Sequence, residues 1–353
     1  MAFDFPNSPT VGQVVTTPGG QQYQWDAVKW VPPTAVTAAQ MGNVGRNLIH
    51  NPYFNVQQRG TGNWTTVGYT ADRWYLSFIT TGGAVNAAIN TLAASTAGNA
   101  FADEAAQYIF SIVATAGTGA GDATLFTQRI ENVRRLSGKT ITVSFWAWAA
   151  SAGLRMGVEL QQNFGTGGSP STTVSGIGSQ SFALVSGTPQ RFTATINMPS
   201  VSSATFGTTA GSDYSVLGFW VSAGSSNTGR SGGVGQQSGN FFIWGVQLEI
   251  GSAATPLEKI DPGEDLRRCQ RFYQTGNFNL FGQAGAANAI LAQQTTFIAP
   301  MRAIPTMATT SRTDTNIGSF SLQPAFQGYA LSLNSTASGQ TGTYGAWTAT
   351  ADL

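Results

Sequence analysis

Apolar and polar residues alternate with a period of two along several stretches of the chain. The pattern is strongest at residues 140–149, where one face is apolar throughout and the other carries Trp146 and Trp148. In residues 240–258 the same period places Phe242, Trp244, Val246 and Leu248 on one face and Phe241, Ile243, Gly245, Gln247 and Glu249 on the other. Successive side chains of a β-strand point to opposite faces of the sheet, so both stretches are predicted to contain half-buried antiparallel strands, the second ending at Gly251.

Similar patterns between these two stretches and before them predict a sandwich. Strands are expected at residues 71–79, 107–113, 123–130, 154–164, 190–198 and 215–221. Loops rich in glycine, serine and threonine separate them, notably at residues 165–180 and 223–239. Short strands, turn signals and the absence of a long amphipathic helix favour a sandwich of two packed sheets. The strand within residues 240–258 is expected to be its last. No repeat of fixed period is present, which argues against a propeller or a β-solenoid.

The first 33 residues form a separate small pattern. Residues 13–17, 21–25 and 29–31 are joined by turns at Pro18-Gly19-Gly20 and Asp26-Ala27, and together they predict a three-stranded meander. Such a small sheet is too short to be stable alone as an ordinary domain. Residues 34–46 are interpreted as a linker.

A helix start separates the sandwich from the end of the chain. Asp261 is suited to cap a helix, Pro262 to its first position, and Glu264 to reach back as in a capping box. In that short helix, Leu266 and Cys269 are three residues apart and are expected to face the core.

A last β-unit is predicted from Phe272-Tyr273 to Leu353. Its expected strands are residues 293–299, 307–312, 328–334 and 344–350. About 80 such residues are enough for a small sandwich, and Pro300 and Pro305 suit edge positions or bends. The domain organisation is therefore 1–33, 34–46, 47–260 and 261–353.

The composition narrows the functional classes. Only 9% of the residues are charged, against about a quarter in an ordinary soluble domain. The hydrophobic content of 41% excludes a disordered chain. Uncharged polar residues replace the missing charges, which is more typical of extracellular or particle-surface proteins than of metabolic enzymes.

The charge balance and the rare residue types exclude further classes. A net charge of +1 provides no basic footprint for nucleic acid. The single cysteine, Cys269, excludes an intramolecular disulfide and any zinc site with several cysteines. The single histidine, His50, would have to serve any Ser-His-Asp triad alone. No signal peptide and no membrane-spanning segment are expected from the sequence.

One motif resembles a known group of proteins. Residues 243–258, IWGVQLEIGSAATPLE, followed by CQRFY at 269–273, resemble a recurrent pattern of bacteriophage tail-fibre and virion-surface proteins. Residues 47–54 and 71–75 resemble the first strands of the same module. In those proteins the motif strand is the last of a jelly roll akin to carbohydrate-binding modules. The resemblance implies an all-β chain: a jelly-roll β-sandwich preceded by a small β-meander and followed by a second small β-sandwich.

A glycan site in such a jelly roll needs aromatic faces and uncharged or amide groups. Trp146 and Trp148 lie on one strand face, and Gln247 and Glu249 lie on a polar face of the closing strand, so these four residues are candidate glycan contacts. Two alternatives stay open. The tryptophans can belong to the core or to an interface, and loops can carry recognition instead.

The N-terminal meander carries three aromatic residues, Tyr23, Trp25 and Trp30. "GQVV…Y-WD…KW" resembles a short module near the ends of phage structural proteins, which implies docking onto the virion. The alternatives are a mini-sheet folded against the main body and a chitin-type binder that stacks sugars on these rings.

The sequence contains no clear motif for catalysis or for metal binding. Glycoside hydrolysis requires two carboxylates across the scissile bond, and the candidates are scattered without a motif: Asp72, Asp103, Glu104, Asp122, Glu131, Glu159, Asp213 and Glu249. We therefore expect a protein that is not an enzyme and has no cofactor. A structural Ca²⁺ held by some of the first four acids is an open alternative, with no ligand assigned.

Together these observations predict a phage virion protein. The expected role is a tail fibre or receptor-binding protein that docks through its N-terminal unit to other phage proteins and presents a surface for host glycans. The resemblance implies a homotrimer, assembled in the host cytoplasm as part of the virion, without nucleic acid or membrane insertion. The alternatives are a capsid decoration protein or head fibre, and a polysaccharide depolymerase.

Overall fold

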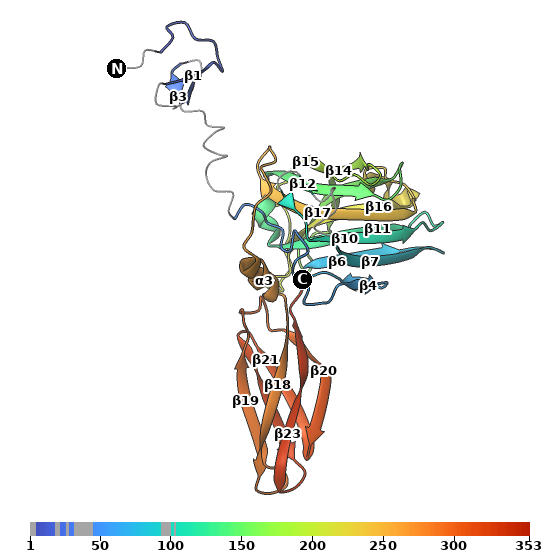
Figure 1. The fold of residues 1–353 in the computed structure, drawn as a ribbon, viewed down its shortest axis with the longest axis vertical. Helices are drawn as coiled ribbons and strands as arrows, with labels where there is room; N and C mark the ends of the chain where they lie inside the picture. Colours follow the sequence, from blue (N-terminus) through green and yellow to red (C-terminus); the bar gives the residue numbers. More distant parts are fainter. Residues whose placement is uncertain (1–4, 18–21, 26–27, 32–44, 93–99, 102–103) are drawn as a thin grey trace. The chain divides into compact units, whose positions relative to one another are not determined.

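The computed structural model describes residues 5–17, 22–25, 28–31, 45–92, 100–101 and 104–353 (Figure 1). The chain divides into two compact units, one of residues 1–46 with 255–259 and one of residues 47–254 with 260–353. Most of the expected linker, residues 34–44, lies outside the described ranges. In the described part of the chain, no helix is long and apolar enough to cross a membrane.

The small N-terminal unit contains the predicted meander. Its three antiparallel strands are β1 (Val14–Thr16), β2 (Gln22–Trp25) and β3 (Trp30–Val31), in that spatial order. Trp25 is paired with Trp30 across β2 and β3, with their ring centroids 5.6 Å apart. The sheet is therefore organised around an aromatic cross-strand pair.

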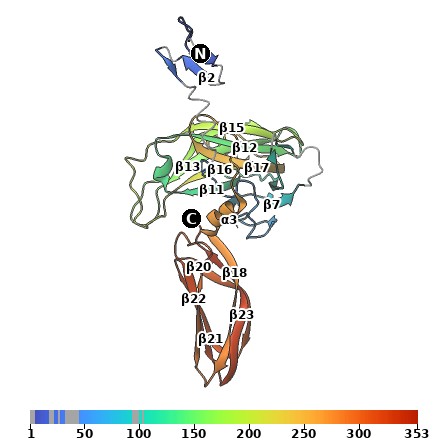
Figure 2. The same cartoon turned by 60° about the vertical axis from the view of Figure 1, so that its left-hand side comes forward.

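The larger unit begins with a jelly-roll β-sandwich of two antiparallel six-stranded sheets (Figures 1 and 2). The first sheet contains, in spatial order, β15 (Gln190–Asn197), β12 (Thr140–Ala149), β17 (Gly239–Ile250), β10 (Tyr108–Thr115), β7 (Ala84–Thr91) and β4 (Gly62–Trp64). The second sheet contains β14 (Val174–Ala183), β13 (Arg155–Asn163), β16 (Tyr214–Ala223), β11 (Ala123–Glu131), β6 (Trp74–Ile79) and β5 (Gly68–Tyr69). Short elements complete the jelly roll: β8 (Ala100–Phe101), β9 (Glu104–Ala105), η1 (Val133–Leu136), η2 (Ser225–Asn227) and α2 (Thr228–Ser231).

Aromatic side chains from both sheets form the core of the jelly roll. Phe110 of the first sheet stacks on Phe126 of the second, with ring centroids 4.3 Å apart. Phe145 of the first sheet meets Phe219 of the second edge to face at 4.9 Å. All four side chains are fully buried, so these contacts join the inner faces of the two sheets.

The closing strand β17 departs from strict alternation at Gly245. The pairing of β12 with β17 is shifted between Ser144 and Trp146, and Gly245 has a φ of 60°. This is a β-bulge, because one strand carries extra residues opposite its partner and a glycine occupies the left-handed conformation. Trp244 therefore lies on the same face as Gln247, not on the opposite face as the period of two predicted.

Two other expectations for the jelly roll were wrong. Residues 165–180 were expected to be a loop, but β14 begins at Val174. Residues 47–54 form no strand; instead the side chain of Asn47 bonds β17, donating to the Val246 carbonyl and accepting from the Leu248 amide at 2.9 and 3.1 Å. A side-chain clamp of this kind satisfies backbone groups without the period of a strand.

Helix α3 (Pro262–Gln270) starts at the predicted cap, Asp261, but in this described part of the chain the predicted capping box of Glu264 is not seen. The side chain of Asp261 accepts a hydrogen bond from the Glu264 amide at 3.0 Å, and Pro262 occupies the first turn. The carboxylate of Glu264 pairs with Arg267 and Arg268. Cys269 is fully buried as expected, whereas Leu266 is 37% exposed and the expectation that it faces the core was wrong.

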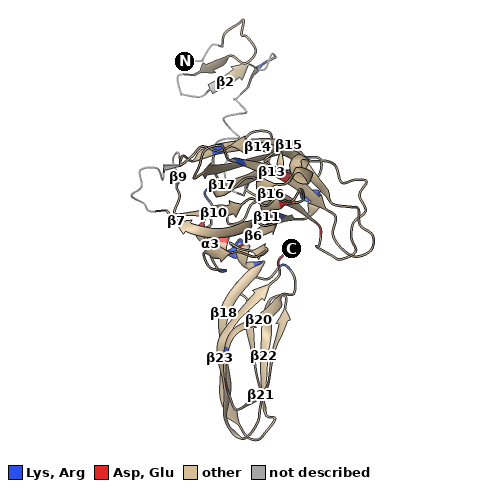
Figure 3. Ribbon diagram, turned by 90° about the vertical axis from the view of Figure 1, so that its right-hand side faces the viewer, with Lys and Arg blue, Asp and Glu red and all other residues tan. Residues whose placement is uncertain are grey.

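The C-terminal β-unit is a small sandwich of two three-stranded sheets (Figure 2). One sheet contains β18 (Tyr273–Ala284), β23 (Gly339–Thr350) and β20 (Thr306–Thr315), and the other contains β19 (Ile290–Thr296), β22 (Gly328–Ser335) and β21 (Ile317–Ala325). Its core includes Phe278, Leu331 and Trp347. Figure 3 shows few charged positions on these strands. Arg312 and Asp314, both on β20, form an ion pair at 2.9 Å.

Arginine side chains connect this sandwich to the jelly roll. Arg59 pairs with Asp352 at 2.5 Å, and Arg73 lies over the ring of Phe272, with its guanidinium carbon 3.3 Å from the centroid. Glu131 at the end of β11 accepts hydrogen bonds from Arg271 at 2.9 Å and Arg302 at 3.2 Å. The arginine bonds hold the pKa of Glu131 below its ordinary value against the opposing effect of burial.

Candidate functional site

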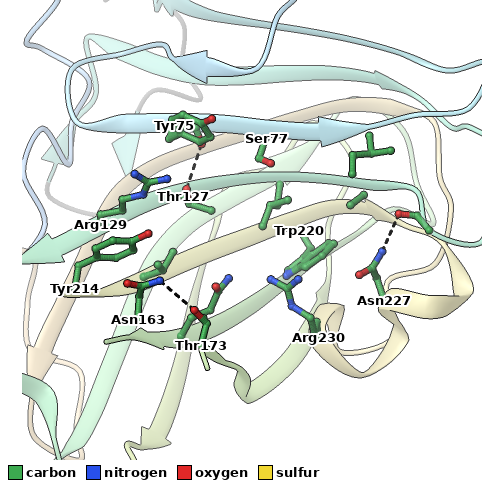
Figure 4. Close-up of a pocket in the computed structure, with 16 residues that line it drawn as sticks. Tyr75, Ser77, Thr127, Arg129, Asn163, Thr173, Tyr214, Trp220, Asn227 and Arg230 are labelled. Carbon is green, nitrogen blue, oxygen red and sulfur yellow. Dashed lines mark hydrogen bonds between the residues drawn. The ribbon is translucent and has the colours of Figure 1, made fainter. Parts of the chain in front are cut away.

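The outward face of the second sheet forms a cleft of about 310 Å³ (Figure 4). Its floor consists of β6, β11, β16 and β13, and the short helix α2 borders it. On β6 the period of two decides which residues reach it. Tyr75 and Ser77 line the cleft, whereas Trp74 and Leu76 are fully buried on the other face.

One part of the cleft is built around Arg129 of β11. Its guanidinium carbon lies 5.1 Å from the ring centroid of Tyr75 and 5.0 Å from that of Tyr214. Tyr75 belongs to β6 and Tyr214 to β16, the two neighbours of β11, so three adjacent strands supply the group. Arg129 also donates to the main-chain oxygen of Leu353. These contacts hold the arginine side chain between two half-buried tyrosines.

Another part of the cleft is built around Trp220 of β16. The pairing of β11 with β16 shifts between Thr124 and Leu125, and Trp220 is placed opposite Leu125. The indole is fully buried, and the guanidinium carbon of Arg230 lies 5.0 Å from its ring. Figure 4 shows Trp220 and Arg230 together, away from the group of Tyr75, Arg129 and Tyr214.

Helix α2 brings Arg230 to the cleft because of a glycine on β13. A Cβ atom at Gly157 would lie 2.2 Å from the carbonyl oxygen of Ser231. Any larger residue at position 157 would therefore push α2 away from the sheet.

The buried carboxylate of Glu159 orients the residues of this part of the cleft by accepting their hydrogen bonds. Glu159 is fully buried and accepts hydrogen bonds from four groups. These are Nη2 and Nε of Arg230 at 2.6 and 3.2 Å, Nε1 of Trp220 at 3.1 Å, Nε2 of Gln161 at 2.8 Å and the amide of Gly176 at 2.8 Å. A buried charge needs such compensation. The carboxylate is used in orienting its neighbours and does not line the cleft.

The lining of the cleft is suited to sugars. It combines aromatic rings with hydroxyl, amide and guanidinium groups, and it includes two arginines and no aspartate or glutamate. Apolar ring faces bind the apolar faces of sugars, and the polar groups bind their hydroxyls. Without two carboxylates in the lining, the cleft lacks the pair that glycoside hydrolysis requires.

The four predicted glycan residues lie on the outward face of the first sheet, away from this cleft. The register places Ser144 opposite Gln247 and Trp146 opposite Trp244, so the four candidate residues share one face. Trp146 is half-buried, but Trp148, Gln247 and Glu249 are 7%, 0% and 3% exposed. A glycan has little access to three of them in this structure, and their role in binding stays a prediction.

These four side chains are packed as a cluster. Trp148 stacks on Phe242 with centroids 5.1 Å apart, and Nε2 of Gln247 donates to Oε1 of Glu249 at 3.0 Å. The arrangement agrees with the alternative reading in which the tryptophans contribute to packing.

The three candidate docking residues cluster in the N-terminal unit. Tyr23 meets Phe5 edge to face at 5.2 Å, and Trp30 stacks on Phe5 at 5.3 Å, in addition to its contact with Trp25. All three are half-buried. The rings thus hold the meander together, and whether they also dock onto a virion stays a prediction.

Among the residues suggested for calcium, Asp72 and Asp122 have protein donors. Asp72 accepts from the amide and Nε2 of Gln58, both at 2.8 Å, and Asp122 accepts from the amides of Thr81 and Gly119. Asp103 lies outside the described residues. Across the described part of the chain, no group of three or more metal-ligating side chains is found.

Five residues of the cleft were not among the candidates predicted from the sequence: Tyr75, Arg129, Tyr214, Trp220 and Arg230. A signal was present for the first two, because they stand at alternating positions in predicted strands, on the face opposite the apolar residues. Trp220 also stands in alternation with Tyr214 and Val216, because the bulge of β16 comes after it. Arg230 stands in a segment that was expected to be a loop.

Known proteins show only distant similarity to this chain. Neither a scan against protein-family models nor a search of curated proteins finds a match. Among solved structures, the CBM22-2 xylan-binding domain of Paenibacillus barcinonensis Xyn10C is 13% identical and aligns with a TM-score of 0.30 over 52% of this chain and 94% of that domain. The family 11 carbohydrate-binding module from Clostridium thermocellum, in complex with a β-1,3-1,4-mixed-linked tetrasaccharide, is 10% identical, with a TM-score of 0.31 over 56% and 99%.

A phage protein is also similar. The enzymatically active domain of tailspike protein 4 from bacteriophage CBA120 is 15% identical, with a TM-score of 0.29 over 57% of this chain and 22% of the tailspike chain. The matched part of this chain thus spans about a fifth of that protein. At these identities the similarities concern the β-sandwich fold only.

Proposed function

We propose that this chain is a non-catalytic phage virion protein whose jelly roll binds polysaccharide on the host cell surface. The observation that carries the binding proposal is the cleft on the second sheet, where Tyr75, Tyr214 and Arg129 from three neighbouring strands meet at one surface. The motif at residues 243–258, with its resemblance to phage tail-fibre proteins, supports the virion part of the proposal. A homotrimer, and docking through the N-terminal unit, belong to the same proposal.

The chemistry of the cleft supports the part of the proposal that concerns binding without hydrolysis. Glu159, whose carboxylate is bonded to the lining residues Arg230 and Trp220, is fully buried and accepts from four donor groups, so it is poorly placed to act as a nucleophile or as a general acid. The test is to incubate purified protein with host polysaccharide. Release of reducing ends would show that the protein is catalytic and would contradict the proposal.

The glycan site is tested by affinity electrophoresis of the full chain in gels that contain host surface polysaccharide. Tyr75→Ala and Tyr214→Ala should each weaken binding at least about tenfold, because each removes a stacking face, and tenfold corresponds to about 1.4 kcal/mol. Tyr75→Phe keeps the ring and should bind nearly as well as the wild type.

Tyr344→Ala is the matched control. Tyr344 is 52% exposed on β23 of the C-terminal sandwich, and its loss should leave binding unchanged. If Trp146→Ala abolishes binding while both cleft variants retain it, the site lies on the first sheet, as the sequence analysis predicted, and the cleft proposal fails.

The position on the particle is tested by electron microscopy of virions labelled with antibody against this chain. Label at the tail tip, together with blocked adsorption by purified protein, is the expected result. Label over the head with unchanged adsorption would favour the decoration protein, and absence of label would overturn the virion assignment.

A further inference from the structure

The charged groups of the cleft are all of one sign. Of the side chains that line it, Arg129 and Arg230 are the charged ones, and no aspartate or glutamate is among them. The whole chain has nearly as many acidic as basic residues, 16 against 17, whereas both charged residues of the lining are arginines. A neutral glycan needs hydroxyl and amide partners but no cation, so the arginines require another explanation.

Arg129 is fixed by two aromatic rings and by the hydrogen bond that its Nη1 donates to the main-chain oxygen of Leu353. The rings of Tyr75 and Tyr214 lie on its two sides at 5.1 and 5.0 Å, as Figure 4 shows. Contact of a guanidinium with aromatic faces orients the group and limits its hydration without cancelling its charge. Arg129 is thus held as a preformed anion contact.

The surroundings of Arg129 add positive charge. Its carbonyl oxygen accepts a hydrogen bond from Nη2 of Arg73 at 2.6 Å. Arg73 and Arg59 share one carboxylate, Asp352, at 3.8 and 2.5 Å. Arg59 and Arg73 thus lie near Arg129, and Asp352 is the carboxylate that these two arginines share.

Arg230 is a second, weaker contact. Its Nε and Nη2 are bonded to the buried carboxylate of Glu159, which cancels most of its charge but holds the guanidinium rigidly. The side chain remains 37% exposed, so its other edge faces the cleft. Arginine, unlike lysine, presents paired N–H donors that match the two oxygens of a carboxylate.

We propose that the cleft selects glycans that carry carboxylates, such as polymers of hexuronic acids, with Arg129 as the principal contact and Arg230 as the second. This inference rests on the proposed glycan function and names its substrate class. The chemistry shared with phosphate-bearing glycans is an oxyanion, and the two sources are separated by the test.

The test measures binding of the full chain to polygalacturonate, alginate and hyaluronan, and to the same polymers after their carboxyl groups are reduced to alcohols. At least one acidic polymer should bind about tenfold or more tightly than its reduced form. Its affinity should fall between 50 and 300 mM NaCl, because added salt screens charge. A polyol phosphate serves as the phosphate arm, and xylan and mixed-linked glucan serve as neutral polymers.

Three variants locate the selectivity. Arg129→Gln should remove the preference for the acidic polymer, and Arg129→Lys should restore only part of it, because lysine keeps the charge and loses the paired donors. Arg312→Gln is the matched control, since Arg312 is 37% exposed on β20, and it should behave as the wild type.

Three other outcomes would contradict either the carboxylate selectivity or the glycan function itself. Equal binding of an acidic polymer and its reduced form, lost in Tyr214→Ala, overturns the carboxylate selectivity and leaves the glycan function standing. If only the polyol phosphate binds, the proposed selectivity for carboxylates is wrong and the ligand is a phosphate-bearing glycan. Folded protein that binds none of these polymers and no host polysaccharide overturns both the selectivity and the proposed function.

Discussion

On the first sheet of the jelly roll, Trp146 and Trp148 share their outward face with Gln247 and Glu249, and three of these four residues are buried. On the second sheet, half-buried tyrosines border an accessible cleft of about 310 Å³. Both faces combine aromatic rings with amide groups. They differ in access, and in how the polar groups are used.

The difference teaches that residue type does not identify a binding face. On the first sheet the bulge at Gly245 turns Trp244 to the side of Trp146, and the polar pair of Gln247 and Glu249 is bonded internally. On the second sheet the buried Glu159 organises its neighbours from below and leaves polar groups directed at the cleft. The first face is packed, and the second keeps polar groups at an accessible cleft.

The largest expected effect is on the buried face. Trp148→Ala removes a buried indole that stacks on Phe242 and should reduce the free energy of unfolding by about 3–5 kcal/mol. Tyr214→Ala, on the accessible face, should cost less stability and more binding. Urea denaturation of the two variants checks the contrast, and equal loss of stability in both would break the comparison.

A substitution on helix α3, outside both outward faces of the jelly roll, is expected to change stability without changing glycan binding. Burial raises the pKa of Asp265 on α3 from 3.8 to about 6, while the bond that its Oδ1 accepts from the Asn51 amide opposes the rise. A carboxyl whose folded pKa is raised favours the folded state while it is protonated. This stabilisation is complete below about pH 4 and is lost as the pH rises through 6.

Asp265→Asn should therefore be more stable than the wild type at pH 7.5, by up to about 3 kcal/mol, with the advantage vanishing near pH 4. Asparagine keeps the acceptor for the Asn51 amide. Denaturation curves at both pH values check the sign, and glycan binding should be unchanged. A variant that is less stable at pH 7.5 would show that the charge of Asp265 is needed in the fold.

Glu159→Gln tests whether the accessible face depends on its buried carboxylate. An amide oxygen cannot serve all four donor groups, and Arg230 loses its counter-charge, so the free energy of unfolding should fall by about 2 kcal/mol. Binding should weaken as Arg230 loses its orientation. Gln161→Ala removes one of the four donor groups and keeps the carboxylate, and it should have a smaller effect on both measurements.

The smallest effect is expected at the bulge of the first sheet. Gly245→Ala places a Cβ atom at a φ of 60°, which should cost about 1–2 kcal/mol in the free energy of unfolding. Glycan binding on the second sheet should not change. Loss of binding in this variant would mean that the first face takes part in recognition, and the contrast between the two faces would not hold.

Much of the fold could be predicted from the sequence. The bounds of β12 agree with the predicted residues 140–149, the N-cap at Asp261 is confirmed, and the three-stranded meander and the terminal sandwich are present. These features depend on local rules, since the period of two and the capping geometry involve residues close together in the chain.

The candidate site depended on tertiary structure. The bulge at Gly245 is a property of the paired strands and is not visible in the alternation of one strand. Tyr75, Arg129 and Tyr214 are far apart in the sequence and become neighbours because β6, β11 and β16 lie side by side. The sequence by itself determined that outward-facing aromatic residues exist on several strands. Which outward face is packed and which is accessible was decided by the assembled sheets, because burial is a property of what surrounds a residue and not of the residue.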